Sequence, residues 1–139
     1  MLLVLFTTSL MPRTLLFVVL AISTLLELGL TGGVFLAPAF TLARFKVKYG
    51  PETQFLGYIT GWFLLLVTLL AALAWVQVRQ RRPGYAGLCY VLGLWWIGLG
   101  VGVYVVFGRP ENLVLDSLKG LLIVVLTWRY QASRLLLRR

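Results

Sequence analysis

The sequence predicts an all-α fold, an integral membrane four-helix bundle in which residues 1–139 form a single transmembrane domain. Hydrophobic residues make up 60% of the chain and charged residues only 12%, whereas soluble domains have about 45–50% and 25%. The apolar residues are grouped into runs of the length that a helix needs to cross a bilayer core of about 30 Å. Basic residues cluster in the short segments between these runs, as in membrane proteins.

The first two predicted spans are long apolar runs. The first covers residues 14–37, and the second covers residues 55–78 and ends at a basic cluster between residues 79 and 82. Residues 1–12 are apolar but too short to cross a membrane, and Pro12 separates them from the first span. They lack the basic start and cleavage site of a signal peptide. We therefore expect them to form an interfacial segment or a frayed extension.

The third predicted span covers residues 84–107 and stops at the Gly-Arg-Pro sequence of residues 108–110, a combination that ends helices. The fourth covers residues 113–130. It carries Asp116 and Lys119 in its first turns, so its uninterrupted apolar part is short. Four crossings place both ends of the chain on one side of the membrane.

The distribution of basic residues predicts that both termini are cytoplasmic, because cytoplasmic loops of membrane proteins carry an excess of Lys and Arg. The side with the termini holds eight basic residues, namely Arg13, Arg79, Arg81, Arg82, Arg129, Arg134, Arg138 and Arg139. The other side holds five, namely Arg44, Lys46, Lys48, Arg109 and Lys119. We interpret the clustered charges as anchors for membrane lipids and not as a nucleic-acid-binding face.

The residues that most enzymes use are missing from this sequence. It has no histidine and a single cysteine, Cys89, which is most simply a small core residue. No metal-ligand cluster, nucleophile with an adjacent base, or phosphate-binding glycine loop is evident. We therefore predict no catalytic residues, no metal, no cofactor and no enzymatic activity.

Glu27 is the first candidate functional residue because it lies inside the first predicted span. An acidic residue at the centre of a membrane helix costs about 2.5–3.5 kcal/mol, so it should be neutral, paired or facing a cavity. Two interpretations remain open. Glu27 is a proton-coupled or partner-binding carboxylate, or it is a protonated acid that donates a hydrogen bond to a neighbouring helix.

Asp116 and Lys119 are the other ionisable residues predicted to lie in the membrane. They are three residues apart, so they share a helix face and can pair. A bridge from Lys119 to Glu27 is conceivable at similar membrane depth. We favour the local pair, because each side chain leans towards the N-terminus of its own helix and these two helices run in opposite directions.

Glycine pairs four residues apart occur in three of the predicted spans, and small residues at this spacing let membrane helices approach closely. They predict the helix-packing faces, whether the partner helix belongs to this chain or to another one. The pairs are Gly29 and Gly33, Gly57 and Gly61, and Gly98 and Gly102.

Trp95 and Trp96 lie in the middle of the third predicted span, away from the interfaces where tryptophan is usual. An indole N–H in this position needs a hydrogen-bond partner. We expect both rings to pack against helices or lipid, and the alternative is that they form the wall of a lipid or ligand site.

The region from about 14 to 130 resembles the DoxX-like group of small four-helix bacterial membrane proteins. The resemblance rests on a glycine-rich first helix, a basic connector and glycines in the second helix. The named positions are Pro38, Tyr49-Gly50, Gly57, Gly61 and Gly108-Arg109-Pro110. It implies a protein of the bacterial inner membrane, and some members of the group are similar to subunits or partners of membrane redox systems.

Three functional hypotheses follow. The first is an accessory or structural subunit that binds other membrane-protein subunits, or further copies of itself, through glycine faces and aromatic ridges. The second is a small proton-coupled transporter that uses Glu27. In having four short helices and a carboxylate in the first, the chain is similar to the small multidrug-resistance transporters, but its first connector is longer and basic. The third is a protein that binds a quinone or lipid against Trp95 and Trp96.

Overall fold

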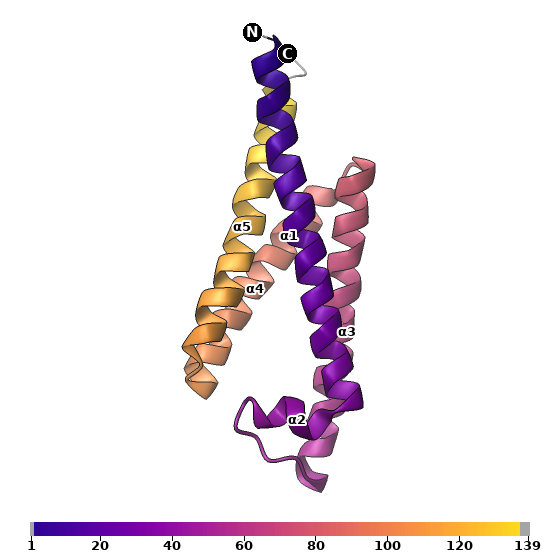
Figure 1. The fold of residues 1–139 in the computed structure, drawn as a ribbon, viewed down its shortest axis with the longest axis vertical. Helices are drawn as coiled ribbons and strands as arrows, with labels where there is room; N and C mark the ends of the chain where they lie inside the picture. The colour runs from indigo at the N-terminus through magenta and orange to yellow at the C-terminus, as the bar shows by residue number, and fades with distance from the viewer. Residues whose placement is uncertain (1, 137–139) are drawn as a thin grey trace.

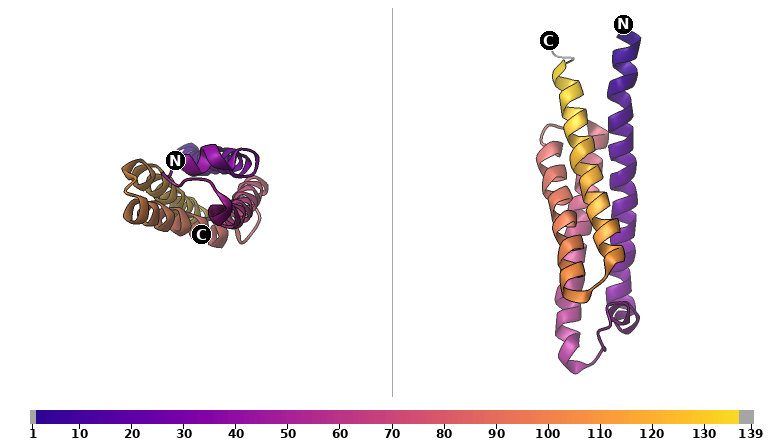
Figure 2. Two further views of the ribbon diagram at one scale, coloured as in Figure 1. Left: turned by 90° about the horizontal axis from the view of Figure 1, so that it is seen from below. Right: turned by 90° about the vertical axis from the view of Figure 1, so that its left-hand side faces the viewer.

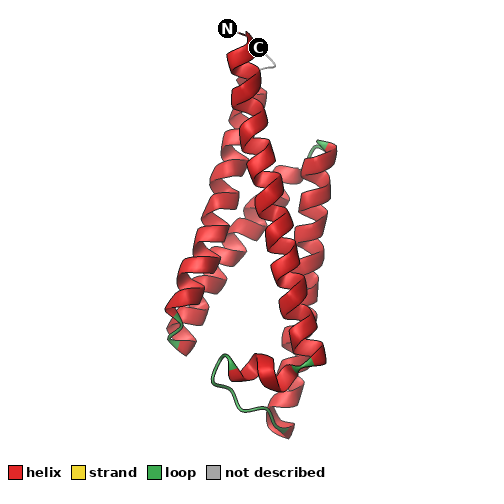
Figure 3. Ribbon diagram, in the orientation of Figure 1, coloured by secondary structure: helices red, strands yellow, loops and turns green. Residues whose placement is uncertain are grey.

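The structure is a computed structural model that describes the backbone of residues 2–136 and the side chains of residues 11–134. This part of the chain is helical with short connections and contains no strand (Figure 3). The helices are α1 (Leu2–Leu36), α2 (Pro38–Ala43), α3 (Pro51–Gln80), α4 (Tyr85–Phe107) and α5 (Pro110–Leu136). The all-α prediction is therefore confirmed.

The four long helices are arranged as two pairs. Helix α1 packs along α3, and α4 packs along α5, while α1 also contacts α5 (Figures 1 and 2). The two pairs diverge towards the lower end of Figure 1, where α2 lies across the bundle. The beginning of α1, the α3–α4 turn and the end of α5 point towards the same end of the bundle.

Three helices are long and apolar enough to cross a membrane, namely Met11–Leu36, Pro51–Gln80 and Tyr85–Phe107. They correspond to the first three predicted spans. Helix α5 does not belong to this set, although its 27 residues are sufficient in length. Its charged and polar side chains lower its hydropathy, so the fourth crossing stays a prediction.

The predicted ends of the helices differ from the structure in two places. Helix α1 continues through Pro12 to Leu2, so residues 2–12 lengthen the first helix, in agreement with the predicted extension and not with a separate interfacial segment. A proline removes one backbone hydrogen bond, and a long apolar helix tolerates this loss. The sequence analysis also missed α2, which begins at Pro38, because six residues are too few to show a helical pattern.

The closest approach of two helices is between α4 and α5, and it depends on glycines that the pair pattern did not identify. A Cβ atom added to Gly120 would collide with the carbonyl oxygen of Gly93 and lie 2.8 Å from Ile97. One added to Gly100 would lie 2.7 Å from the Ser117 hydroxyl and 3.0 Å from a backbone carbonyl. Only glycine allows this contact.

The six predicted packing glycines divide into two groups. A Cβ atom on Gly61 would lie 2.8 Å from the Phe35 ring, and one on Gly33 would lie 3.0 Å from the Thr41 hydroxyl. A Cβ atom on Gly57 would lie at an ordinary van der Waals distance of 4.0 Å from the Leu42 side chain. The positions at which the space is open, with nothing within 4 Å, are Gly29, Gly98 and Gly102. These three do not close a helix contact within this chain.

Candidate functional site

Glu27 lies at the centre of a buried polar cluster where α1, α4 and α5 meet. Its side chain is only 3% exposed. The indole Nε1 of Trp96 donates a hydrogen bond of 2.8 Å to Glu27 Oε1, and the ammonium group of Lys119 donates a second one of 2.8 Å to the same oxygen. The Lys119 nitrogen also lies 4.5 Å from the centre of the Trp96 ring. One carboxylate oxygen thus joins three helices.

Asp116 extends the cluster along α5. Its carboxylate lies 3.1 Å from the Lys119 nitrogen, and the Asn112 amide donates a hydrogen bond of 3.2 Å to its second oxygen. Residues 112, 116 and 119 share one face of α5 because they are spaced at four and three residues. This inward face carries the polar groups of the first turns of α5, while Val114, Leu115 and Leu118 are exposed on the other side.

The structure brings all three predicted ionisable residues together. The local pair of Asp116 and Lys119 forms as predicted. The bridge to Glu27 also forms, so the argument from side-chain direction was wrong in disfavouring it. Lysine has a flexible four-carbon stem, and its reach is greater than the offset that the lean of two antiparallel helices produces.

The cluster contains two carboxyl groups and one ammonium group, so it carries a net negative charge when all three are ionised. Both donors to Glu27 use Oε1, and no hydrogen bond from a described residue reaches Oε2. The site can therefore accept a further hydrogen bond or a positive charge. Such a group is favoured here because the low dielectric strengthens electrostatic interactions.

A cavity of about 330 Å³ adjoins this cluster between the two helix pairs. Glu27, Asp116 and Asn112 line its polar end, and the hydroxyl-bearing residues Thr41 and Thr60 also line it. The rest of the wall is aliphatic or aromatic and comes from α1, α2, α3, α4 and the segment after α2, with Leu30, Val34, Leu99 and Phe107 among its residues. Ligand pockets in proteins combine a largely apolar wall with a few polar groups in this way.

The two tryptophans that the sequence analysis grouped together have different environments. Trp96 is fully buried and belongs to the polar cluster, whereas Trp95 is 38% exposed. The ring of Trp95 packs against Phe63 of α3 with the ring centres 5.3 Å apart. Neighbouring residues point to different sides of a helix, so only one of the two can face the cluster.

Trp95 borders a shallow groove of about 430 Å³ on the outer surface of α4. Gly98 and Gly102 line it, together with apolar residues that include Leu94, Val106 and Phe107. The predicted glycine pair of the third span therefore faces outwards.

A second interhelical polar contact links the hydroxyl groups of Thr31 on α1 and Thr68 on α3, which are 3.2 Å apart and buried. The sequence analysis did not single out Asn112, Thr31 or Thr68. The spacing of four residues between Asn112 and Asp116 was a usable signal, but nothing local indicated that Thr31 and Thr68 would meet.

In comparisons with protein-family models, with curated proteins and with solved structures, the chain has no match.

Proposed function

We propose that this chain is a four-crossing membrane protein that binds a small amphipathic molecule in the cavity between its two helix pairs. The observation that carries the proposal is the position of the Glu27 carboxylate, which is buried within a membrane-spanning helix and borders an apolar cavity. An intramembrane ionisable group of this kind marks a functional site by default, because burying it is costly.

In this proposal α5 is the fourth crossing. Its charged side chains face Glu27 and Asn112, while leucine and valine side chains cover its outward face. Helix α5 also packs along α4, which is itself long and apolar enough to cross a membrane. The excess of basic residues at the end with the α3–α4 turn supports a cytoplasmic location of both termini, in a membrane such as the bacterial inner membrane.

The ligand in this proposal has an apolar body and a hydrogen-bond-donating or cationic end. The aliphatic wall suits the body, and the unpaired Oε2 of Glu27 together with Asp116 suits a donor. A group that only accepts hydrogen bonds fits less well, because the Trp96 and Lys119 donors are already used by Glu27. Of the ligands named from the sequence, a hydroxyl-bearing lipid satisfies this condition and an oxidised quinone does not. A quinol or a lipophilic amine satisfies it as well.

The test uses two probes of equal chain length, decylamine and decanoic acid, with the protein in lipid nanodiscs. Binding is measured by equilibrium dialysis of radiolabelled probe against loaded and empty discs. We expect the protein to retain the amine above the lipid background and not the acid. In Glu27→Gln, which keeps the shape of the side chain, we expect loss of about tenfold in amine affinity, as for a charged hydrogen bond.

The matched control is Glu111→Gln, which makes the same chemical change on an exposed side chain paired with Arg109. Equal amine binding by the protein, Glu27→Gln and Glu111→Gln would contradict the proposal. If the Glu27→Gln variant loses binding, a flux assay in proteoliposomes with a pH gradient then distinguishes a proton-coupled transporter from a binding protein.

A second candidate function, that of an accessory subunit, is supported by the outward groove of α4. Gly98 and Gly102 have open space above them and meet no helix in the part of the chain that the structure describes, so a helix of another membrane-protein subunit fits there. Gly98→Leu fills the groove without touching the cavity cluster. Purification from native membranes in mild detergent should recover a partner subunit with the original chain and lose it in the variant.

A further inference from the structure

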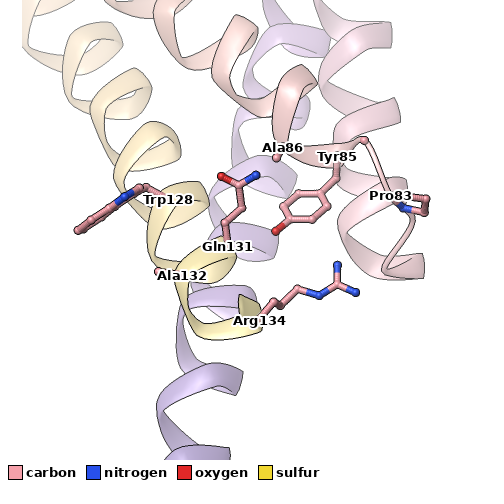
Figure 4. A pocket seen from close by; sticks show the side chains of 8 residues that line it. Pro83, Tyr85, Ala86, Trp128, Gln131, Ala132 and Arg134 are labelled. Atoms are coloured by element: carbon pink, nitrogen blue, oxygen red, sulfur yellow. The ribbon is translucent and has the colours of Figure 1, made fainter. Parts of the chain in front are cut away.

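A second pocket lies at the opposite end of the bundle from α2, between the start of α4 and the last turns of α5. It has a volume of about 440 Å³ and is separate from the cavity at Glu27 (Figure 4). Tyr85, Gln131 and Arg134 contribute its polar groups, and Pro83, Ala86 and Trp128 contribute apolar surface. Figure 4 shows Tyr85 of α4 beside Gln131 and Arg134 of α5, with the Trp128 ring directed away from them.

The polar side chains of this pocket retain hydrogen-bond donors that the described residues do not fully use. Tyr85 is only 4% exposed, and its buried hydroxyl makes no hydrogen bond of ordinary geometry to a described residue, although the Arg134 guanidinium lies near enough to interact with it. Gln131 accepts a bond of 2.8 Å from Tyr90 through Oε1, which leaves its amide nitrogen as a donor. Arg134 lies over the Tyr130 ring, 5.8 Å from its centre.

The first turn of α4 adds backbone donors to the same pocket. Gly84 precedes this helix with a positive φ of 95° and provides no side-chain cap. The first N–H groups of a helix have no partner within the helix, and they favour negatively charged groups. Tyr85 is the first residue of this turn. Its hydroxyl, which lacks a hydrogen-bond partner of ordinary geometry, favours the same negatively charged kind of ligand.

The charge around the pocket is strongly positive. Arg79, Arg81 and Arg82 lie at the end of α3, next to the turn that leads into Tyr85. The four acidic residues of the sequence, Glu27, Glu52, Glu111 and Asp116, do not line this pocket. An anion at this end therefore meets attraction and no nearby repulsion from carboxylates.

We infer that this pocket binds the phosphodiester headgroup of an anionic phospholipid. A phosphate accepts bonds from Tyr85, Gln131, Arg134 and the first turn of α4, while Trp128 and the alanines contact the glycerol and upper acyl chains. Trp128 is 63% exposed, in keeping with the interfacial position that tryptophan favours. The site does not depend on the proposed ligand cavity, which lies on the other side of the polar cluster.

The experiment is native mass spectrometry of the full chain in mixed micelles that contain equal amounts of phosphatidylglycerol and phosphatidylcholine with identical acyl chains. We expect the first phosphatidylglycerol to bind about fivefold more tightly than phosphatidylcholine, as one well-placed arginine near a membrane surface can provide. Tyr85→Phe is the decisive variant, because it removes one hydroxyl and changes no charge. It should lose most of the preference, as should Arg134→Gln.

Two matched controls accompany these variants. Tyr104→Phe makes the same change on an exposed ring near the far end of α4, and Arg129→Gln removes the same charge from an exposed residue outside the pocket. Both should keep the preference. An equal loss in Arg129→Gln and Arg134→Gln, with no effect of Tyr85→Phe, would overturn the inference, because the preference would then reflect only the general positive charge.

Competition with inorganic phosphate tests whether the pocket binds a lipid or a free anion. Phosphate at 100-fold excess over the lipid should leave phosphatidylglycerol bound, because only the lipid also contacts the apolar surface. Full displacement at that excess would overturn the assignment to a lipid. Tyr85→Phe breaks no hydrogen bond of ordinary geometry among the described residues, so a loss of lipid binding in this variant does not reflect unfolding.

Discussion

The contact between α4 and α5 differs in kind from the contact between the two helix pairs. Between α4 and α5, Gly93 and Gly120 bring the backbones together and leave no room for a side chain. Between the pairs, one carboxylate joins three helices at a single level, and a cavity remains beside it. Close backbone packing makes a rigid seam, whereas a polar cluster fixes one point and leaves space for a ligand.

The largest effect is expected from removing the positive charge of the cluster. Lys119→Met leaves the Glu27 and Asp116 carboxylates without their common partner, and breaking a buried pair in this way costs about 3–5 kcal/mol. Unfolding by sodium dodecyl sulfate in mixed micelles, followed by circular dichroism, measures the loss. Adding Glu27→Gln should restore part of the stability, and a single variant as stable as the original chain would disprove the role of the cluster.

The rigid seam should be almost as sensitive to a single methyl group. Gly120→Ala drives a Cβ atom into the backbone of α4, and because neither backbone can yield we expect a loss of about 3 kcal/mol, at the upper end of overpacking costs. The same unfolding assay measures it. Gly98→Ala is the matched control, since that position is open; if both variants behaved alike, the contrast between the seam and the open face would not hold.

Trp96→Phe should have a moderate effect. It removes the indole donor to Glu27 but keeps an aromatic ring near Lys119, so we expect a loss of about 1.5 kcal/mol, in the upper range for hydrogen bonds between membrane helices. Trp95→Phe changes the neighbouring ring, which makes no contact with Glu27, and should cost less. A reversed order of the two variants would refute the division of roles between these tryptophans.

The smallest effect is expected at the hydroxyl contact between α1 and α3. Thr68→Val removes the contact with Thr31 and keeps the shape of the side chain, so the loss should be about 0.6 kcal/mol, the average for such bonds in membranes. A loss of more than 2 kcal/mol would mean that this contact, and not the Glu27 cluster, determines how α1 is held.

The sequence predicted the helices better than their contacts. Three long apolar helices follow directly from hydropathy, because each span satisfies its own backbone hydrogen bonds. The four-residue spacing of glycines predicted Gly98 and Gly102 as packing positions and did not identify Gly93 and Gly120. Spacing along one helix does not show which face of the helix contacts a neighbour. That information depends on the rotation of two helices about their axes, which only the tertiary structure provides.

The candidate site could be predicted in its components and not in its arrangement. Glu27 stood out as a costly residue within an apolar run, and the pairing of Asp116 with Lys119 followed from helix geometry. The convergence of Glu27, Lys119 and Trp96 depends on contacts separated by 69 and 92 positions in the chain, which no local pattern encodes. The cavity beside them exists because the helix pairs diverge, and this too is a property of the whole bundle.

Arg13 shows that one residue can contribute both to membrane orientation and to the joining of two helices. Its guanidinium donates hydrogen bonds of 2.9 Å to the carbonyl oxygen of Arg79 and 3.4 Å to that of Val78, at the end of α3. A lysine here would contribute equally to the charge count but could not offer donors in a planar fork to two neighbouring carbonyls. An exchange of Arg13 for lysine should therefore preserve the positive charge at this end of the bundle while loosening the register of α1 against α3, so the two properties can be altered independently.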